Sequence, residues 1–150
     1  MVAAEAEGVS LTLDGVKAAF ATMRDFDVAL VEGAGGLLVP ISGNCSMASL
    51  AAMLDLPLLI VARPSLGTIN HTLLTIEAAR QRGLSIVGVV FSEATDARSR
   101  GPEEARTPSL IGELGGVRIW GTLPYISASS AAASRPDGEL GELVAHLATF

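Results

Sequence analysis

The sequence predicts an α/β fold with a mostly parallel β-sheet flanked by helices. Short runs of aliphatic residues alternate along the chain with segments whose apolar residues recur every three or four positions, and these patterns are typical of strands and helices. The short runs are apolar at nearly every position, as in strands buried on both faces of a parallel sheet. Their alternation with helical segments favours parallel strands joined by right-handed crossovers.

Capping residues, turn residues and apolar runs predict the order of the elements. Strands are expected over 27–32, 56–62, 84–91 and 117–123. Helices are expected from Thr12 or Asp14 to about Arg24, over 47–54 after Ser46, over 68–82 before Gly83, over 104–113 and over 138–148. A turn is expected over 42–44, and loops over 63–67, 92–103 and 127–136. At 150 residues the chain is expected to form a single domain.

The helical spacing also predicts which residues pack in the core. Four of the predicted helices carry apolar residues at helical spacing. The predicted apolar positions are Met47, Leu50, Ala51 and Leu54 in the helix 47–54, and Ile69, Leu73, Ile76 and Ala78 or Ala79 in the helix 68–82. In the helix that ends near Arg24 they are Val16, Ala19, Phe20 and Met23, and in the helix 138–148 they are Leu140, Leu143, Val144 and Leu147.

The composition excludes several classes of function. A net charge of −6 and the absence of a basic run argue against nucleic-acid binding. The single Cys45 rules out an internal disulfide framework and suits a reducing compartment. One Cys and two His do not make a zinc site of the usual spacing. No membrane span or signal peptide is expected, because the apolar runs are too short and the first residues are acidic.

The chain is unusually apolar for a small domain. Hydrophobic residues make up 49% of it and charged residues only 17%, with a mean hydropathy of +0.48. Strands buried on both faces are one reason for such a composition. A large interface with a partner is the other, since exposed apolar patches usually mark one.

One acidic residue stands at the end of a predicted strand. Glu32 closes the run 27–32, and Gly33, Gly35 and Gly36 follow it. In an open α/β sheet, ligands bind beyond the carboxyl ends of the strands, and glycine allows the backbone to approach a phosphate or a metal closely. The alternative is a strand followed by a mobile glycine turn, with Glu32 simply solvated.

Three motifs carry a family resemblance. VEGAGGLLVPI at 31–41, LGTINHTLLT at 66–75 and GTLPY at 121–125 resemble, in order and spacing, the motifs of the dethiobiotin synthetase family. The resemblance covers nearly the whole chain. It implies a P-loop NTPase-like fold, truncated at the N-terminus, and a cytoplasmic, homodimeric ligase of biotin biosynthesis, with residues 1–150 forming one partial synthetase domain.

The resemblance also implies roles for individual residues. Glu32 corresponds to a ligand of Mg²⁺, and the cofactors implied are Mg²⁺ and ATP. The residues implied in ATP binding are Glu32, Gly33, Gly35, Gly36, Ser92, Leu123 and Pro124. Those implied in binding the carboxylate tail of the substrate, through backbone amides at a helix start, are Gly67, Thr68, Ile69 and Asn70.

Some of these roles have alternatives. Asn70 could be a plain capping or packing residue, and His71 is more simply a surface or structural histidine than a catalyst. Ser92 stands where family members often have an asparagine that contacts adenine at two points, and one hydroxyl does not reproduce this contact. Residues 121–125 could be only the end of a strand and a rigid turn.

The phosphate loop of P-loop enzymes is missing from the sequence. No G-x-x-x-x-G-K-[ST] segment occurs, and the only lysine, Lys17, lies within a predicted helix and is expected to be a solvated charge. A wrongly assigned start, a split gene or a remnant with another role would each explain this. No catalytic residue is therefore identified, and we expect the chain alone to be inactive and to expose sheet edges.

The resemblance implies a reaction and leaves rivals. Its small-molecule substrates are 7,8-diaminononanoate, CO2 and ATP, and the product is dethiobiotin. One rival is an ATP-dependent amide synthase of the cobyrinic acid type. The other is a non-catalytic half of a split synthetase, which would need a complementing chain with the phosphate loop.

Overall fold

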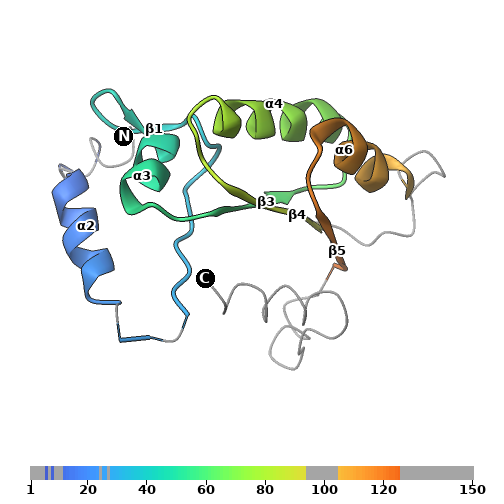
Figure 1. Ribbon diagram of the computed structural model, residues 1–150. Coiled ribbons are helices and arrows are strands. Elements are labelled where there is room, and N and C mark those ends of the chain that lie inside the picture. Colours follow the sequence, from blue (N-terminus) through green and yellow to red (C-terminus); the bar gives the residue numbers. More distant parts are fainter. Residues whose placement is uncertain are drawn as a thin grey trace. The chain divides into compact units, whose positions relative to one another are not determined.

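The computed structural model describes residues 6, 8, 12–23, 25–26, 28–93 and 105–125 (Figure 1). They belong to two compact units, Met1–Pro57 with Ala78–Ser85, and Leu58–Glu77 with Ile86–Phe150, and each unit is described by itself. The predicted loop 127–136, the predicted helix 138–148 and most of the loop 92–103 lie outside the described residues. None of the described helices is long and apolar enough to cross a membrane. The prediction of a single domain stays a prediction.

The first helix of the first unit, α2 (Leu13–Ala21), begins at Thr12. The Thr12 hydroxyl accepts a hydrogen bond from the Gly15 amide at 3.2 Å, which satisfies one of the free amides of the first turn. Of the two predicted caps, Thr12 is therefore the correct one. The helix ends at Ala21, earlier than predicted, and none of its residues is fully buried.

The predicted strand 27–32 is wrong for the residues that the structure describes. Residues 28–33 have no regular structure, and Val28, Leu30 and Val31 are exposed, Leu30 by 76%. A strand exists only when its backbone groups pair with a neighbour, and the described part of the chain supplies no neighbour to this run. The apolar composition of the run identified a segment that favours burial, but it contained no information on the pairing partner.

A tight hairpin follows the glycine-rich segment. Strands β1 (Pro40–Ser42) and β2 (Cys45–Ser46) pair antiparallel, and Gly43 at the turn has a φ of +53°. The turn over 42–44 is confirmed. The two strands were not predicted, because two or three residues are too few to show a period.

Helix α3 (Met47–Leu54) has the predicted bounds. Ser46 and Ser49 form a reciprocal capping box: the Ser49 amide donates to the Ser46 hydroxyl at 3.3 Å, and the Ser46 amide donates to the Ser49 hydroxyl at 3.1 Å. The predicted inward stripe is only half-buried, and the fully buried residue is Ala48. The Ala48 amide donates to the Leu37 carbonyl oxygen at 2.8 Å, which brings residues before the hairpin against this side of the helix.

Removing this cap should weaken the helix. We expect Ser46→Ala to lower the free energy of unfolding by about 1 kcal/mol, because an orphan amide at the first turn loses its acceptor. The measurement is urea denaturation followed by far-UV circular dichroism. Ser85→Ala, at an exposed position outside the helices, is the control and should leave the midpoint unchanged. Equal midpoints for the two variants would contradict the role of Ser46.

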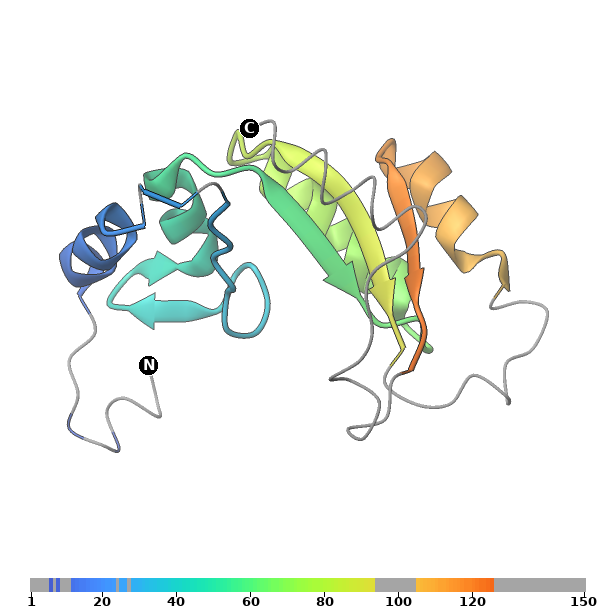
Figure 2. The same cartoon turned by 90° about the horizontal axis from the view of Figure 1, so that it is seen from below.

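The second unit is built on a parallel sheet. Strands β3 (Leu58–Ala62), β4 (Ile86–Ser92) and β5 (Ile119–Leu123) lie side by side in this order, and both neighbouring pairs are parallel (Figure 2). The predicted α/β class with a parallel sheet is confirmed.

All three strands begin two residues later than predicted, for one physical reason. The predicted first residues are Leu56, Leu84 and Val117, and each donates its amide to a carbonyl of the preceding helix, at 3.5, 3.0 and 3.3 Å. Each follows a residue with positive φ, namely Asp55, Gly83 and Gly116. This hydrogen bond and the preceding residue with positive φ form the Schellman motif, which ends a helix. The residue that the apolar pattern assigned to the start of the strand therefore belongs to the end of the helix.

Helices α4 (Thr68–Arg80) and α6 (Thr107–Gly115) lie on the same face of the sheet (Figure 1). Pro108 stands in the first turn of α6, so the helix begins later than the predicted residue 104. The predicted inward residues of α4 are confirmed, and Ala79 rather than Ala78 is fully buried. The core between helices and sheet consists of Ala62, Ile76, Val89, Phe91 and Ile111, with Ile60, Ile69, Leu73, Ile86, Val117 and Ile119 packed against them.

The opposite face of the sheet has a second cluster around Trp120 and Val90. The Trp120 indole lies over Gly88, and its N–H donates to the Val87 carbonyl oxygen at 3.2 Å. The Arg118 guanidinium stacks on the indole, 3.5 Å from the ring centroid. The pairing of β4 with β5 shifts register between Val89 and Val90, beside this contact. An isolated glycine within a predicted strand is a known signal of such a close approach, and Gly88 was not recognised as one.

Candidate functional site

The glycine loop, defined here as residues 32–39, is a compact turn in the first unit. Gly35 has a φ of +78°, and a Cβ built on it would lie 3.1 Å from Val39 Cγ2. The Val39 amide donates to the Gly36 carbonyl oxygen at 2.9 Å and closes the turn. A side chain at Gly35 would require both an unfavourable backbone conformation and a displaced Val39, so this glycine is needed for the shape of the loop.

The glycine loop is attached to the start of α3 through its own carbonyl groups. The Met47 amide donates to Val39 O at 3.0 Å and the Ala48 amide to Leu37 O at 2.8 Å, while the Ser49 amide is capped by Ser46. The first amides of α3 are thus already paired, and this helix start has little capacity to bind a phosphate. Chemistry at the glycine loop therefore depends on the Glu32 carboxylate and on the backbone of the glycines.

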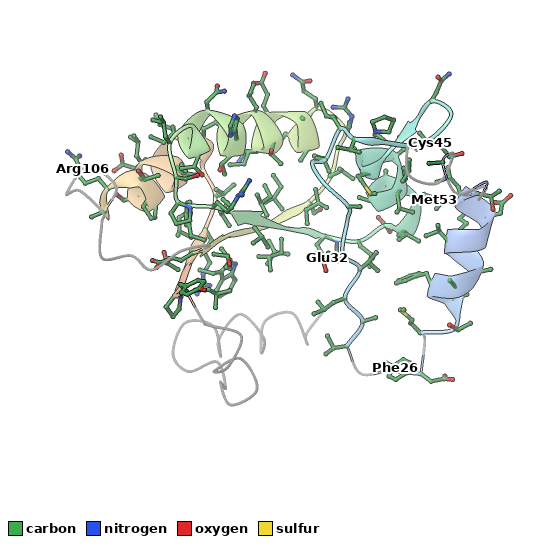
Figure 3. The ribbon with its side chains drawn as sticks, turned by 180° about the vertical axis from the view of Figure 1, so that it is seen from behind. Phe26, Glu32, Cys45, Met53 and Arg106 are labelled. Atoms are coloured by element: carbon green, nitrogen blue, oxygen red, sulfur yellow. The ribbon has the colours of Figure 1, made fainter. Side chains whose placement is uncertain are left out.

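Glu32 is exposed and is the first residue of the glycine loop, directly after the irregular residues 28–31 (Figure 3). Within the described ranges, no three His, Cys, Asp or Glu side chains come together as a ligand cluster. The described chain therefore does not form an all-protein cage for zinc or calcium around Glu32. Mg²⁺ commonly takes one or two carboxylates and completes its shell with water and phosphate oxygens. An accessible single carboxylate fits that requirement.

The second unit brings the ends of its three strands to one edge. Ala62 pairs with Phe91, and Ser92 pairs with Leu123, so the carboxyl ends of β3, β4 and β5 are level. The Glu93 amide donates to the Leu123 carbonyl oxygen at 3.0 Å and extends the ladder by one bond. Ser92 and Leu123 are half-buried here and Pro124 is exposed, so the structure brings these three predicted residues together.

Helix α4 begins near this same edge of the sheet, because the short loop 63–67 joins the end of β3 to the first residue of α4. Gly67 has a φ of +89°, and a Cβ built on it would lie 3.2 Å from Cε1 of the His71 ring. The Thr68 amide donates to Ser65 O and the His71 amide to Gly67 O, both at 3.0 Å. The ring of the exposed His71 thus lies against the turn, and the interpretation of His71 as a surface or structural histidine stays a prediction.

In the predicted substrate-binding segment, residues 67–70, the groups open to a ligand are mainly those of the backbone. Thr68 is buried and Ile69 packs against the core, whereas Gly67 and Asn70 are exposed. In the described chain, no acceptor pairs with the Ile69 or Asn70 amide. Two unpaired amides at the positive end of a helix dipole suit a carboxylate or phosphate oxygen. The role of this segment in binding a substrate carboxylate stays a prediction, and its main-chain amides are the groups that would fill it.

Comparison with known proteins gives a consistent result. A family model described as an AAA domain matches residues 1–133. The chain is similar to the ATP-dependent dethiobiotin synthetase BioD of Bacillus cereus (strain ATCC 14579), with 41% identity over 105 residues, which is 70% of this chain and 43% of that protein. It is equally similar to the proteins of that name from Bacillus thuringiensis (strain Al Hakam) and Bacillus anthracis (strain A0248), with 42% identity over 103 residues, 69% of this chain and 42% of each relative.

The chain thus spans 43% of the length of the Bacillus cereus relative. The match of the family model over residues 1–133 covers most of the chain. The chain belongs to the AAA domain family and, within it, to the dethiobiotin synthetase family.

Proposed function

We propose that the chain contributes to ATP-dependent synthesis of dethiobiotin from 7,8-diaminononanoate and CO2. The observation that carries this proposal is the 41% identity, over 70% of the chain, to a protein named ATP-dependent dethiobiotin synthetase. The geometry supports it, because two of the three matching motifs lie at the start of α4 and at the end of β5, on the carboxyl edge of the sheet. Ligands of open α/β sheets bind at that edge.

The reaction can be divided into three steps. One amine of the substrate adds to CO2 and loses a proton, giving a carbamate. A carbamate oxygen attacks the γ-phosphorus of ATP, forming a mixed anhydride and releasing ADP. The second amine then attacks the carbamate carbon, which closes the ureido ring and releases phosphate. Phosphoryl transfer of this kind is accelerated mainly by positioning and by neutralising charge.

Each predicted residue has a role in this scheme. Mg²⁺, when bound, would neutralise charge on the phosphates, and Glu32 would hold it together with water and phosphate oxygens. The backbone of Gly33, Gly35 and Gly36 would approach the nucleotide. The Ile69 and Asn70 amides, in the segment that Gly67 and Thr68 open, would bind the carboxylate of the diamine.

We assign the nucleotide base to the ends of β4 and β5, on the carboxyl edge of the sheet. Ser92, Leu123 and Pro124 would form the wall beside adenine, with one hydroxyl and backbone groups as the polar contacts. We further propose that the protein acts in the cytoplasm, either as a homodimer or with a chain that supplies the phosphate loop.

The 150 residues alone should not turn over ATP, because they contain no loop to hold the triphosphate. The test is a phosphate-release assay with diamine, bicarbonate and Mg-ATP. The purified chain should release no phosphate above background. An assembly completed with the phosphate-loop portion of the Bacillus cereus synthetase should release phosphate only when the diamine is present. Turnover by the chain alone, or no turnover by an assembly that has formed, would contradict the proposal.

A further inference from the structure

The four residues 65–68, called the α4 turn here, form a tight turn directly before helix α4. The Thr68 amide donates to the Ser65 carbonyl oxygen at 3.0 Å, and Gly67 has a φ of +89°, whereas Leu66 has no positive φ. A hydrogen-bonded turn with a positive φ only at its third residue is a type II β-turn. The α4 turn therefore depends on the conformation of a single glycine.

His71 contacts this glycine through its ring and through its main chain. If Gly67 had a Cβ atom, the ring atoms Cε1, Nδ1 and Nε2 of His71 would lie 3.2, 3.6 and 3.8 Å from it. The His71 amide donates to the Gly67 carbonyl oxygen at 3.0 Å, and the His71 carbonyl oxygen accepts a hydrogen bond from the Thr75 hydroxyl at 2.9 Å. The backbone that carries the ring is thus held on both sides.

The ring lies where it opposes a change in the type of turn. Type I and type II turns differ mainly by a rotation of about 180° of their central peptide group, which in the α4 turn joins Leu66 to Gly67. Glycine tolerates both forms, and the hydrogen bond from Thr68 to Ser65 is compatible with both. Neither feature selects the type II form. Packing of the His71 ring against Gly67 does favour one form, because the rotation would move Gly67 against the ring.

We propose that His71 is a positioning residue for the proposed carboxylate site. Its ring keeps the α4 turn in the type II form, so that the Gly67 amide keeps one direction beside the Ile69 and Asn70 amides. In the described part of the chain, none of these three amides has an acceptor. This inference rests on the proposed function and adds a side chain to a site made of main-chain groups. Groups that are ordered before the ligand arrives bind it more tightly, because ordering them on binding costs free energy.

The test is NMR spectroscopy on the full 150-residue chain without nucleotide. Relaxation dispersion at the Gly67 amide detects exchange between turn forms on the microsecond to millisecond timescale. Titration with 7,8-diaminononanoate gives the affinity from the shifts of the Gly67, Ile69 and Asn70 amide signals. The unmodified chain should show no exchange at Gly67 and amide shifts that saturate.

His71→Ala should introduce exchange at Gly67 and weaken binding of the diamine by about tenfold, the loss expected when the binding form of the turn falls to about a tenth of the population. His71→Phe keeps a flat ring and removes the nitrogens and any charge, so it should bind within about twofold of the unmodified chain. Leu74→Ala is the matched control. It removes an exposed side chain from the same helix and should change neither the exchange nor the affinity. Urea unfolding curves confirm that each variant is folded.

Three results would overturn the proposal. In the first, His71→Ala causes no exchange at Gly67. In the second, it causes exchange but binds the diamine as tightly as the unmodified chain. In the third, His71→Phe behaves like His71→Ala, which would assign the effect to the charge or hydrogen bonding of the imidazole. Failure of the proposed function gives a different result: the unmodified chain binds no diamine, although His71→Ala still introduces exchange at Gly67, and the positioning role falls together with the site.

Discussion

Replacing Gly88 by alanine should destabilise the second unit by more than about 3 kcal/mol, at the upper end of the range for overpacked cores. A Cβ at this position would lie 2.6 Å from the Arg118 carbonyl oxygen and 2.6 Å from Trp120 Nε1. In real proteins a Cβ atom essentially never comes this close to an atom to which it is not bonded. The Arg118 oxygen belongs to the backbone of the neighbouring chain segment, so no change of rotamer relieves the contact. The strands β4 and β5 would have to separate, in the middle of the sheet.

The measurement is urea denaturation followed by fluorescence. Trp120 is the only tryptophan of the chain and is itself one of the two contacts, so its emission reports directly on the affected region. Gly36→Ala is the matched control, because a Cβ at Gly36 meets no atom within 4 Å. Its midpoint should remain close to that of the unmodified chain. If Gly88→Ala also kept that midpoint, the close packing of Trp120 over β4 would be refuted.

Glu32→Gln should lower the rate of ATP turnover by about 100-fold or more in an assembly that contains the phosphate loop, the loss typical of removing one group that stabilises charge in a transition state. The substitution keeps the size of the side chain and removes its charge. Since Mg²⁺ binds a neutral amide oxygen more weakly than a carboxylate, the variant should also need a higher Mg²⁺ concentration to reach half of its maximal rate. Phosphate release measured over a range of Mg²⁺ concentrations tests both effects.

The control for this prediction is Glu113→Gln, which removes the same charge from an exposed residue of α6. Its turnover and Mg²⁺ dependence should match those of the unmodified assembly. Glu32 is itself exposed, and no hydrogen bond or ion pair in the described chain holds it, so Glu32→Gln should not change the unfolding midpoint. An unchanged Mg²⁺ dependence together with unchanged turnover would remove Glu32 from the metal site.

Local signals in the sequence predicted the helices well. Ser46 located the start of α3, and Gly83 predicted the end of α4, because a side-chain cap and a left-handed residue act within a few positions along the chain. The apolar face of α4 was correct for the same reason, since helical spacing decides which side chains share one side. The family resemblance likewise identified residues that gather at the carboxyl edge of the sheet, namely Ser92, Leu123 and the turn at Gly67.

The predictions that failed concern contacts between distant residues. Residues 27–32 were predicted to form a buried strand, but the described residues 28–32 form none. A strand also needs a partner, and the hydrophobicity of a segment does not show which other segment will pair with it. Gly88 gained its importance only when β5 brought Trp120 against it, 32 positions away along the chain. Whether Val61 would be covered or exposed depended in the same way on what lies beyond β3.

The sequence by itself determined the α/β class, the parallel direction of the strands, the helix caps and the family. These properties depend on spacing, on capping chemistry and on short motifs, all of which act within one segment or between successive segments. Only the tertiary structure decided that Gly88 accommodates the Trp120 indole, that the first amides of α3 are already paired and that β3 lies at the edge of the described sheet. Each of these depends on groups far apart along the chain, whose meeting is set by packing and pairing of the folded chain rather than by local preference.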